Sequence, residues 1–286
     1  SAVAKIGTSY YATLEEAFEN AASSNVVTLL ANTTINSVIE ISDSITLDLN
    51  GNSIKPSNTY GSDSLFIVHR EGIFTVEDLS TDKDGSIDTN GKVAAAIKLT
   101  DASDADVTAD ITKAAKFVLE SGNIIGKNFG ITGNGNTGRG NTAIVINGGL
   151  VSATATNDST AIYQPQTGTI QINGGSLEAA TGIYNKAGQI TITGGSVVGN
   201  GAYAQATPNG GGFNSTGDAI IMDTHISYEG NMSLSISGDD TVISSEHGYA
   251  VQEVLTDAEI TGTVSINVTI DTDIHEIVEF EATTDS

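Results

Sequence analysis

Short segments that alternate large apolar residues with smaller or polar ones recur along the whole chain. Eight of them share one pattern, two large apolar residues around a middle residue that is usually smaller or polar: residues 47–49, 74–76, 117–119, 144–146, 170–172, 190–192, 234–236 and 264–266. This period of two is typical of a strand with one buried face. The last residues of successive segments are 27, 43, 27, 26, 20, 44 and 30 positions apart. A recurring unit of this size predicts a solenoid.

The shortest repeat runs from Ile172 to Ile192 and has twenty residues. This is too few for a strand, a crossover helix and a return strand, so three short strands joined by turns are expected. Leu177, Ile183 and Ile190 would then point inward from three sides of one coil. Because the neighbouring coils repeat this order, like strands stack on like strands in three parallel sheets. The sequence therefore predicts an all-β fold, a three-sheet parallel β-helix.

Alignment of successive coils also predicts which residues face outward. One interior row contains Ile146, Ile172 and Ile192, and a second contains Ile97, Ile131, Ile162, Ile183 and Ile220. The residues after Ile162 and Ile183 then point outward, which makes Tyr163 and Tyr184 neighbours about 4.8 Å apart at the backbone. An exposed aromatic pair can stack on sugar rings, although such a pair is also an ordinary cross-strand contact. We expect Tyr163, Tyr184 and the loop residue Tyr203 to bind a ligand.

The chain is interpreted as a single domain, residues 1–286, with a cap at each end. Residues 1–25 form the N-terminal cap, in which Thr13 and Glu16 fit a capping box, with each side chain accepting from the other residue's amide. The following helix has an apolar face formed by Leu14, Ala17, Phe18 and Ala21, which we expect to cover the first coil. Residues 268–286 form the C-terminal cap, where alternating charges discourage end-to-end pairing.

The composition of the chain restricts the classes of partner that it is expected to bind. The chain has 11 Lys and Arg against 35 Asp and Glu, a formal net charge of −24 at pH 7. Such a charge argues against nucleic acid as a direct partner. No run of about 18 apolar residues indicates membrane insertion. Cysteine is absent, which is compatible with an exported bacterial protein without disulfides. We expect a monomer.

Several phrases of the sequence resemble a known family. They are residues 3–7, 11–17 and 27–30, the phrase 46–54 (Thr-Leu-Asp-Leu-Asn-Gly-Asn-Ser-Ile), and the coils that contain Asn-Gly-Gly. They resemble repeat-rich surface proteins of gut-type bacteria with a pectin-lyase-like, right-handed β-helix. The resemblance covers nearly the whole chain and implies a right-handed coil and a location outside the cell or on its surface. It implies no defined set of active residues, since this fold hosts lyases, hydrolases and non-catalytic modules.

One group of residues could support hydrolysis. Polygalacturonase-like hydrolases use paired Asp carboxylates near a His-Gly pair, and here Asp239 and Asp240 precede His247 and Gly248. Asp240 and His247 are only seven residues apart, less than one coil, which does not match that acid–base geometry. A lyase would need calcium-binding carboxylates and a basic residue held in a fixed position. Arg139 lies in a glycine-rich loop, which would hold a catalytic guanidinium group poorly.

A second group could hold calcium. Asp82, Asp84 and Asp88 occupy alternating positions around Gly85, as in part of an EF-hand loop. The pattern is incomplete, because Ser80 and Gly91 stand where the first and last ligands belong. A structural turn is the other interpretation, and any bound Ca²⁺ would be structural. No other cofactor is expected.

These observations favour a non-catalytic, extracellular β-helix module of a bacterial surface protein, an adhesin-like unit or a spacer. Its expected partners are a neutral glycan or a host or bacterial surface protein, since an anionic ligand would meet repulsion from the chain's negative charge. The alternative is a carbohydrate-active enzyme, a glycoside hydrolase or polysaccharide lyase, with Asp239, Asp240 and His247 at its site.

Overall fold

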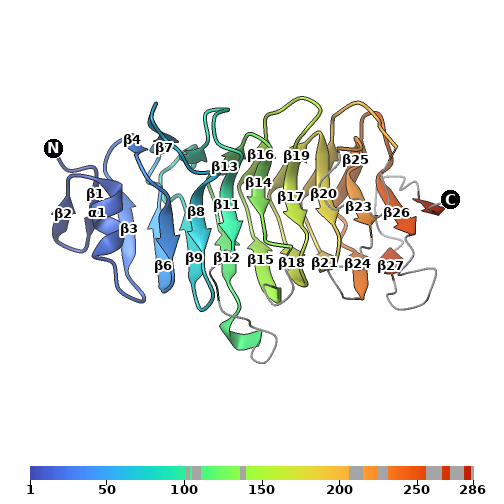
Figure 1. Ribbon diagram of the computed structural model, residues 1–286, viewed down its shortest axis with the longest axis horizontal. Coiled ribbons are helices and arrows are strands. Elements are labelled where there is room, and N and C mark those ends of the chain that lie inside the picture. The colour runs from blue at the N-terminus through green and yellow to red at the C-terminus, as the bar shows by residue number, and fades with distance from the viewer. Residues whose placement is uncertain are drawn as a thin grey trace.

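The computed structural model shows three sheets that wind along a common axis as a right-handed parallel β-helix (Figure 1). It describes residues 1–100, 104, 111–135, 140–205, 215–223, 231–255, 266–270 and 280–284. The first strands of the chain and the last described one, residues 280–284, lie at opposite ends of the rod (Figure 1). The predicted fold class is thus confirmed.

The strands fall into three sets by sheet. The first sheet has the order β2 (Ser9–Tyr11), β1 (Ala4–Ile6), β3 (Val26–Leu29), β6 (Ser44–Asp48), β9 (Ile73–Glu77), β12 (Lys116–Leu119), β15 (Thr142–Ile146), β18 (Gly168–Ile172), β21 (Gln189–Ile192), β24 (Met232–Ile236) and β27 (Ile266–Ile270). The second has β25 (Val242–Ser245), β22 (Ser196–Gly199), β19 (Ser176–Ala179), β16 (Leu150–Ala153), β13 (Asn123–Gly126), β10 (Ser86–Asp88), β7 (Ser53–Pro56) and β4 (Thr33–Ile35). The third has β28 (Phe280–Thr284), β26 (Val251–Leu255), β23 (Ile220–Asp223), β20 (Thr181–Asn185), β17 (Thr160–Gln164), β14 (Phe129–Thr132), β11 (Ala95–Leu99), β8 (Ser64–Val68) and β5 (Ile39–Ile41).

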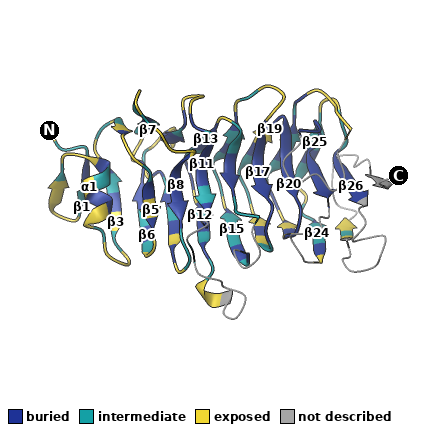
Figure 2. Cartoon of the chain, in the orientation of Figure 1, coloured by how far each residue is buried: buried dark blue, intermediate teal, exposed yellow. Residues whose placement is uncertain are grey.

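The strand register confirms both predicted interior rows. Ile146 pairs with Ile172, and Ile172 with Ile192, in parallel strands of the first sheet, and all three are fully buried. In the third sheet the second row runs in register through Ile97, Ile131, Ile162, Ile183 and Ile220. Figure 2 shows buried residues along the strands and exposed residues mainly in the turns. Apolar residues thus fill the inside of the rod, because every strand turns alternate residues toward it.

The N-terminal end is closed by a hairpin and a short helix. Strand β1 pairs antiparallel with both β2 and β3, so the hairpin extends the first sheet. Helix α1 (Leu14–Glu19) buries Leu14, Ala17 and Phe18, as predicted. The Phe18 ring makes edge contacts with Phe66 and Phe74, at centroid distances of 5.8 and 6.1 Å. The helix therefore covers apolar rings of the first coils, which an open solenoid end would expose.

The capping box in the structure differs from the predicted one in one contact. The Glu16 amide donates to the Thr13 hydroxyl at 3.1 Å, as expected for an N-cap. The Glu16 carboxylate, however, accepts from the Ala12 amide at 3.2 Å and not from that of Thr13. The side chain reaches one residue further back, and the cap still satisfies two backbone donors.

Beyond these elements, a 3₁₀ helix, η1 (Ile111–Lys113), precedes β12. In the predicted C-terminal cap, β27 and β28 extend the first and third sheets, while residues 271–279, 285 and 286 lie outside the described part. Among the described residues, no helix has the length and apolarity to span a membrane.

Candidate functional site

The outer face of the third sheet carries the predicted tyrosine pair. Tyr163 and Tyr184 are in register on β17 and β20, and their rings meet edge to face with centroids 5.8 Å apart. Neither is available to a ligand, because Tyr163 is 8% exposed and Tyr184 is fully buried. They pack with Ile221 and Val254 in an apolar cluster separate from the interior of the rod. The prediction of an exposed pair is therefore wrong, since this outer face has a small core of its own.

A buried ion pair lies next to that cluster. Lys186 lies 3.2 Å from the carboxylate of Asp223, and the Tyr184 hydroxyl donates to the same oxygen at 2.5 Å. Burial, followed by the negative charge of Asp223, raises the pKa of Tyr184 well above its usual value. Tyr184 therefore stays a neutral hydrogen-bond donor, and its role in the structure is to hold the carboxylate.

Tyr203, the third predicted ligand-binding residue, is accessible. It is 44% exposed, and its ring stands perpendicular to that of Tyr249 with centroids 5.7 Å apart. Most of the loop that follows, residues 206–214, lies outside the described part. Tyr203 remains a candidate for contact with a ligand.

The residues of the hydrolase alternative lie on exposed turns. Asp239 and Asp240 form a turn after β24, and His247 lies in a bend after β25. All three side chains are exposed. The His247 imidazole lies 3.9 Å from the carboxylate of Glu246, its neighbour in sequence. His247 thus contacts neither aspartate in the described structure.

The predicted calcium turn is held by a different aspartate. Asp78, at the end of β9, is fully buried and accepts backbone amides from Gly51, Ser80 and Gly85 at 3.0, 2.9 and 2.6 Å. Burial opposes ionisation, but these hydrogen bonds outweigh it and lower the pKa of Asp78. Asp88 instead pairs with Lys55 at 3.5 Å.

Asp82, Asp84 and Asp88 are therefore not gathered around one point. Among the described residues no three His, Cys, Asp or Glu side chains are placed to hold a metal ion. One buried carboxylate, that of Asp78, organises the backbone of this loop, as in a structural turn.

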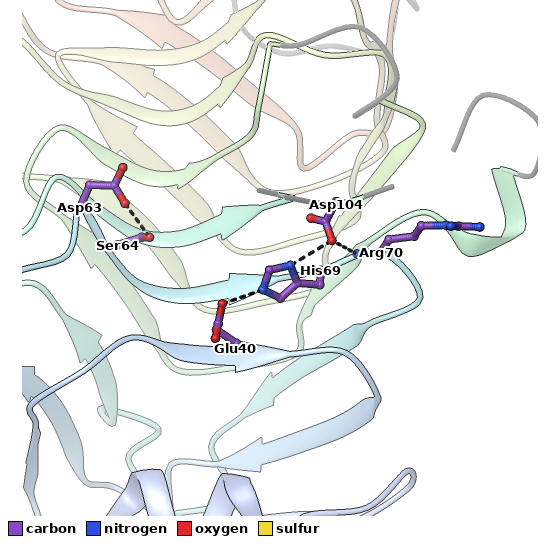
Figure 3. A network of polar contacts seen from close by, with 6 residues as sticks. All are labelled: Glu40, Asp63, Ser64, His69, Arg70 and Asp104. Carbon is purple, nitrogen blue, oxygen red and sulfur yellow. Dashed lines mark hydrogen bonds and ion pairs between the residues drawn. The ribbon is translucent and has the colours of Figure 1, made fainter. Parts of the chain in front are cut away.

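A histidine links three successive coils of the third sheet (Figure 3). The His69 ring lies 3.0 Å from Glu40 through Nε2 and 3.0 Å from Asp104 through Nδ1. Both partners are carboxylates, which accept hydrogen bonds when ionised, so the ring satisfies both when each nitrogen carries a proton. Burial alone would lower the pKa of His69, but the hydrogen bonds to Glu40 and Asp104 raise it.

The same region holds further charged contacts. Lys98 lies 3.4 Å from Asp63, which also accepts from the Ser64 hydroxyl at 3.0 Å (Figure 3). The Asp104 carboxylate accepts from the Arg70 amide at 3.4 Å. The contacts of Lys98 with Asp63 and of Asp104 with Arg70 connect neighbouring coils.

The outer face of the first sheet carries uncharged, mostly polar side chains over its last five strands. We define the polar face as the outward positions of β15, β18, β21, β24 and β27, with the residue after each of the first four strands. In register they form three rows: Ala143, Thr169, Gln189, Ser233 and Asn267; Val145, Gln171, Thr191, Ser235 and Thr269; and Asn147, Asn173, Thr193 and Ser237. None carries a charge, although 16% of the residues in the chain are charged.

A hollow opens at the edge of the polar face where its strands begin. It has a volume of about 500 Å³ and is lined by Asn141, Thr142, Thr167, Gly168, Thr169, Ala187, Gln189 and Asn231. The lining residues that the structure describes are also uncharged. In this respect the hollow resembles the polar face beside it.

Sequence reasoning did not identify this surface. Its signal was present in the middle residues of the repeated segments, such as Gln171 and Thr191, which are polar in consecutive coils. The same residues also produce the alternation that predicts the strands. No protein family, curated protein or solved structure matches this chain.

Proposed function

We propose that this protein is a non-catalytic, extracellular module of a bacterial surface protein, an adhesin-like unit that contacts a neutral glycan or another surface protein. The extracellular setting rests on the resemblance to pectin-lyase-like surface proteins and on the strongly acidic composition. The long rod of stacked coils supports the role, since such an architecture holds binding residues at fixed spacing over a long surface.

The observation that carries the proposal is the arrangement of the acid–base residues. A general acid or base must lie within hydrogen-bonding reach of the reacting group. His247 and the Asp239–Asp240 pair lie on separate exposed turns, and both nitrogens of His69 are occupied by carboxylates. These side chains form structural contacts or face solvent, which supports binding over catalysis.

A reducing-end assay tests the proposal. Purified protein is incubated with polygalacturonate, arabinan, β-glucan and galactomannan, each with Ca²⁺ and with a chelator. We expect no release of reducing ends above a buffer control. Turnover that disappears in Asp240→Asn, with the melting temperature unchanged, would establish the hydrolase alternative and refute the proposal.

Binding is measured in parallel with an array of neutral and acidic glycans. Retention of the protein by neutral members supports the adhesin-like role, and retention only by acidic members contradicts it.

A further inference from the structure

We propose that the polar face and its adjoining hollow form the binding site for a neutral glycan chain. This inference rests on the proposed function, and it adds the location of the site and the class of ligand. Residues Thr169, Gln171, Gln189 and Thr191 lie at its centre and are all exposed.

Charge is the first argument. The chain has a net charge of −24, so most of its surface repels anions and attracts cations. The polar face interrupts this pattern over five neighbouring strands. Its border toward the N-terminus is charged again, with Lys116 and Glu120 in the coil of β12. A ligand without charge fits this surface, because the side chains that define the polar face are uncharged and none of them would be buried as an unpaired charge.

Hydrogen-bonding capacity is the second argument. Hydroxyl and amide side chains both donate and accept, as the hydroxyl groups of a sugar do. Some of these side chains are already fixed in place: Asn173 donates to Asn147 at 2.8 Å and accepts from Thr193 and Gln171, each at 3.1 Å. A side chain held in this way loses less entropy when a ligand binds. These side chains of the polar face are therefore ordered before a polar ligand binds.

Length is the third argument. Neighbouring strands of a sheet lie about 4.8 Å apart, so five strands span about 19 Å. A site of that length accommodates several sugar residues in a row. The regular spacing of the rows suits a polymer that presents similar groups repeatedly along its chain.

The hollow provides a place for one ring or branch. Its volume of about 500 Å³ lies within the range of roughly 300–1,000 Å³ for small-molecule sites. Gly168 is one of its lining residues, with φ of +140°, and a Cβ atom there would lie 2.1 Å from the Thr142 carbonyl oxygen. The Asn141 amide donates to the Thr167 hydroxyl at 3.0 Å. Close backbone packing and this hydrogen bond fix the shape of the hollow.

Near-isosteric substitutions test the site. Gln171→Glu and Gln189→Glu each place one carboxylate on the polar face. Gln205→Glu adds the same charge at an exposed position after β22, in the connection from the second sheet to the third. The wild-type protein and the three variants are run in native gels that contain β-glucan, galactomannan, arabinan or dextran, with polygalacturonate as an anionic comparison. The melting temperature of each variant is recorded.

We expect at least one neutral polysaccharide, and not polygalacturonate, to retard the wild-type protein. Gln171→Glu and Gln189→Glu should each weaken that retardation about tenfold, since a buried charge without a partner opposes binding, while Gln205→Glu should bind as the wild type does. Equal binding by all variants would overturn the assigned site and leave the proposed function standing. Retardation by none of the neutral polymers, or capture of a protein partner through this face, would overturn the ligand class. Cleavage of the polymers would instead refute the proposed function.

Discussion

The Lys186 ammonium group lies 3.2 Å from the Asp223 carboxylate, and neither side chain is exposed to solvent. The ammonium also lies 5.3 Å from the centre of the Tyr184 ring. A buried pair of opposite charges depends on both partners, because either one alone would be buried without its counter-charge.

We expect Lys186→Met to lower the free energy of unfolding by about 3–5 kcal/mol, since it leaves the buried Asp223 carboxylate without its positive partner. The double variant Lys186→Met, Asp223→Leu should be more stable than the single one, because both charges are gone. Urea denaturation of the three proteins measures this difference. If Lys186→Met alone cost less than about 1 kcal/mol, the pair would not govern this region.

Stability should depend on pH through His69. Its pKa is raised in the folded protein, so the folded state binds the proton more tightly than the unfolded state. The stabilisation is fully present below the unfolded pKa of about 6.5 and is lost as the pH rises through the higher folded pKa. Melting temperatures measured from pH 5.5 to 9 should therefore fall across this window in the wild-type protein.

The control for that titration is His69→Gln, which keeps a polar side chain but cannot gain a proton. Its melting temperature should fall less between pH 6.5 and 9 than that of the wild type. Parallel curves for the two proteins would show that the contacts with Glu40 and Asp104 do not carry the pH dependence.

Asp78, and not calcium, should stabilise the turn between β9 and β10. Asp78→Ala removes an acceptor of three backbone amides and should cost about 2–3 kcal/mol. Because the pKa of Asp78 is lowered, its contribution should be present above the unfolded pKa of about 3.9 and be lost as the pH falls through the folded value. Asp82→Ala, at an exposed position, should change stability by no more than about 0.5 kcal/mol.

Calcium provides an independent measurement on the same loop. We expect equal melting temperatures in Ca²⁺ and in a chelator. A rise with Ca²⁺ that disappears in Asp82→Ala would restore the calcium interpretation.

The interior row should be sensitive to the loss of a single side chain. Ile172→Ala removes a fully buried side chain between Ile146 and Ile192 and should cost about 2–5 kcal/mol through lost burial and the cavity that remains. Thr191→Ala, on the outer face of the next coil, serves as the comparison and should cost far less. Similar losses for both variants would contradict the inward orientation of the row.

The architecture could be predicted because its signals are local and repeated. Alternation places Ile146, Ile172 and Ile192 on one side of their strands wherever the coil is placed, and Thr13 caps the helix through a contact within one turn. The exposure of Tyr184 could not be predicted in this way. Its hydroxyl meets Asp223, 39 residues away, and its ring packs with Val254, so its burial depends on residues brought together by stacking of coils.

Periodicity and capping act over a few residues, so the coil, the inward rows and the N-terminal helix follow from the sequence alone. The accessibility of the outward residues depends on how the coils pack. Outward Tyr184 is buried, whereas outward Gln171 and Thr191 are exposed on the polar face. The physical reason is that exposure depends on what packs over a strand, and the packing partners of a coil come from distant parts of the chain.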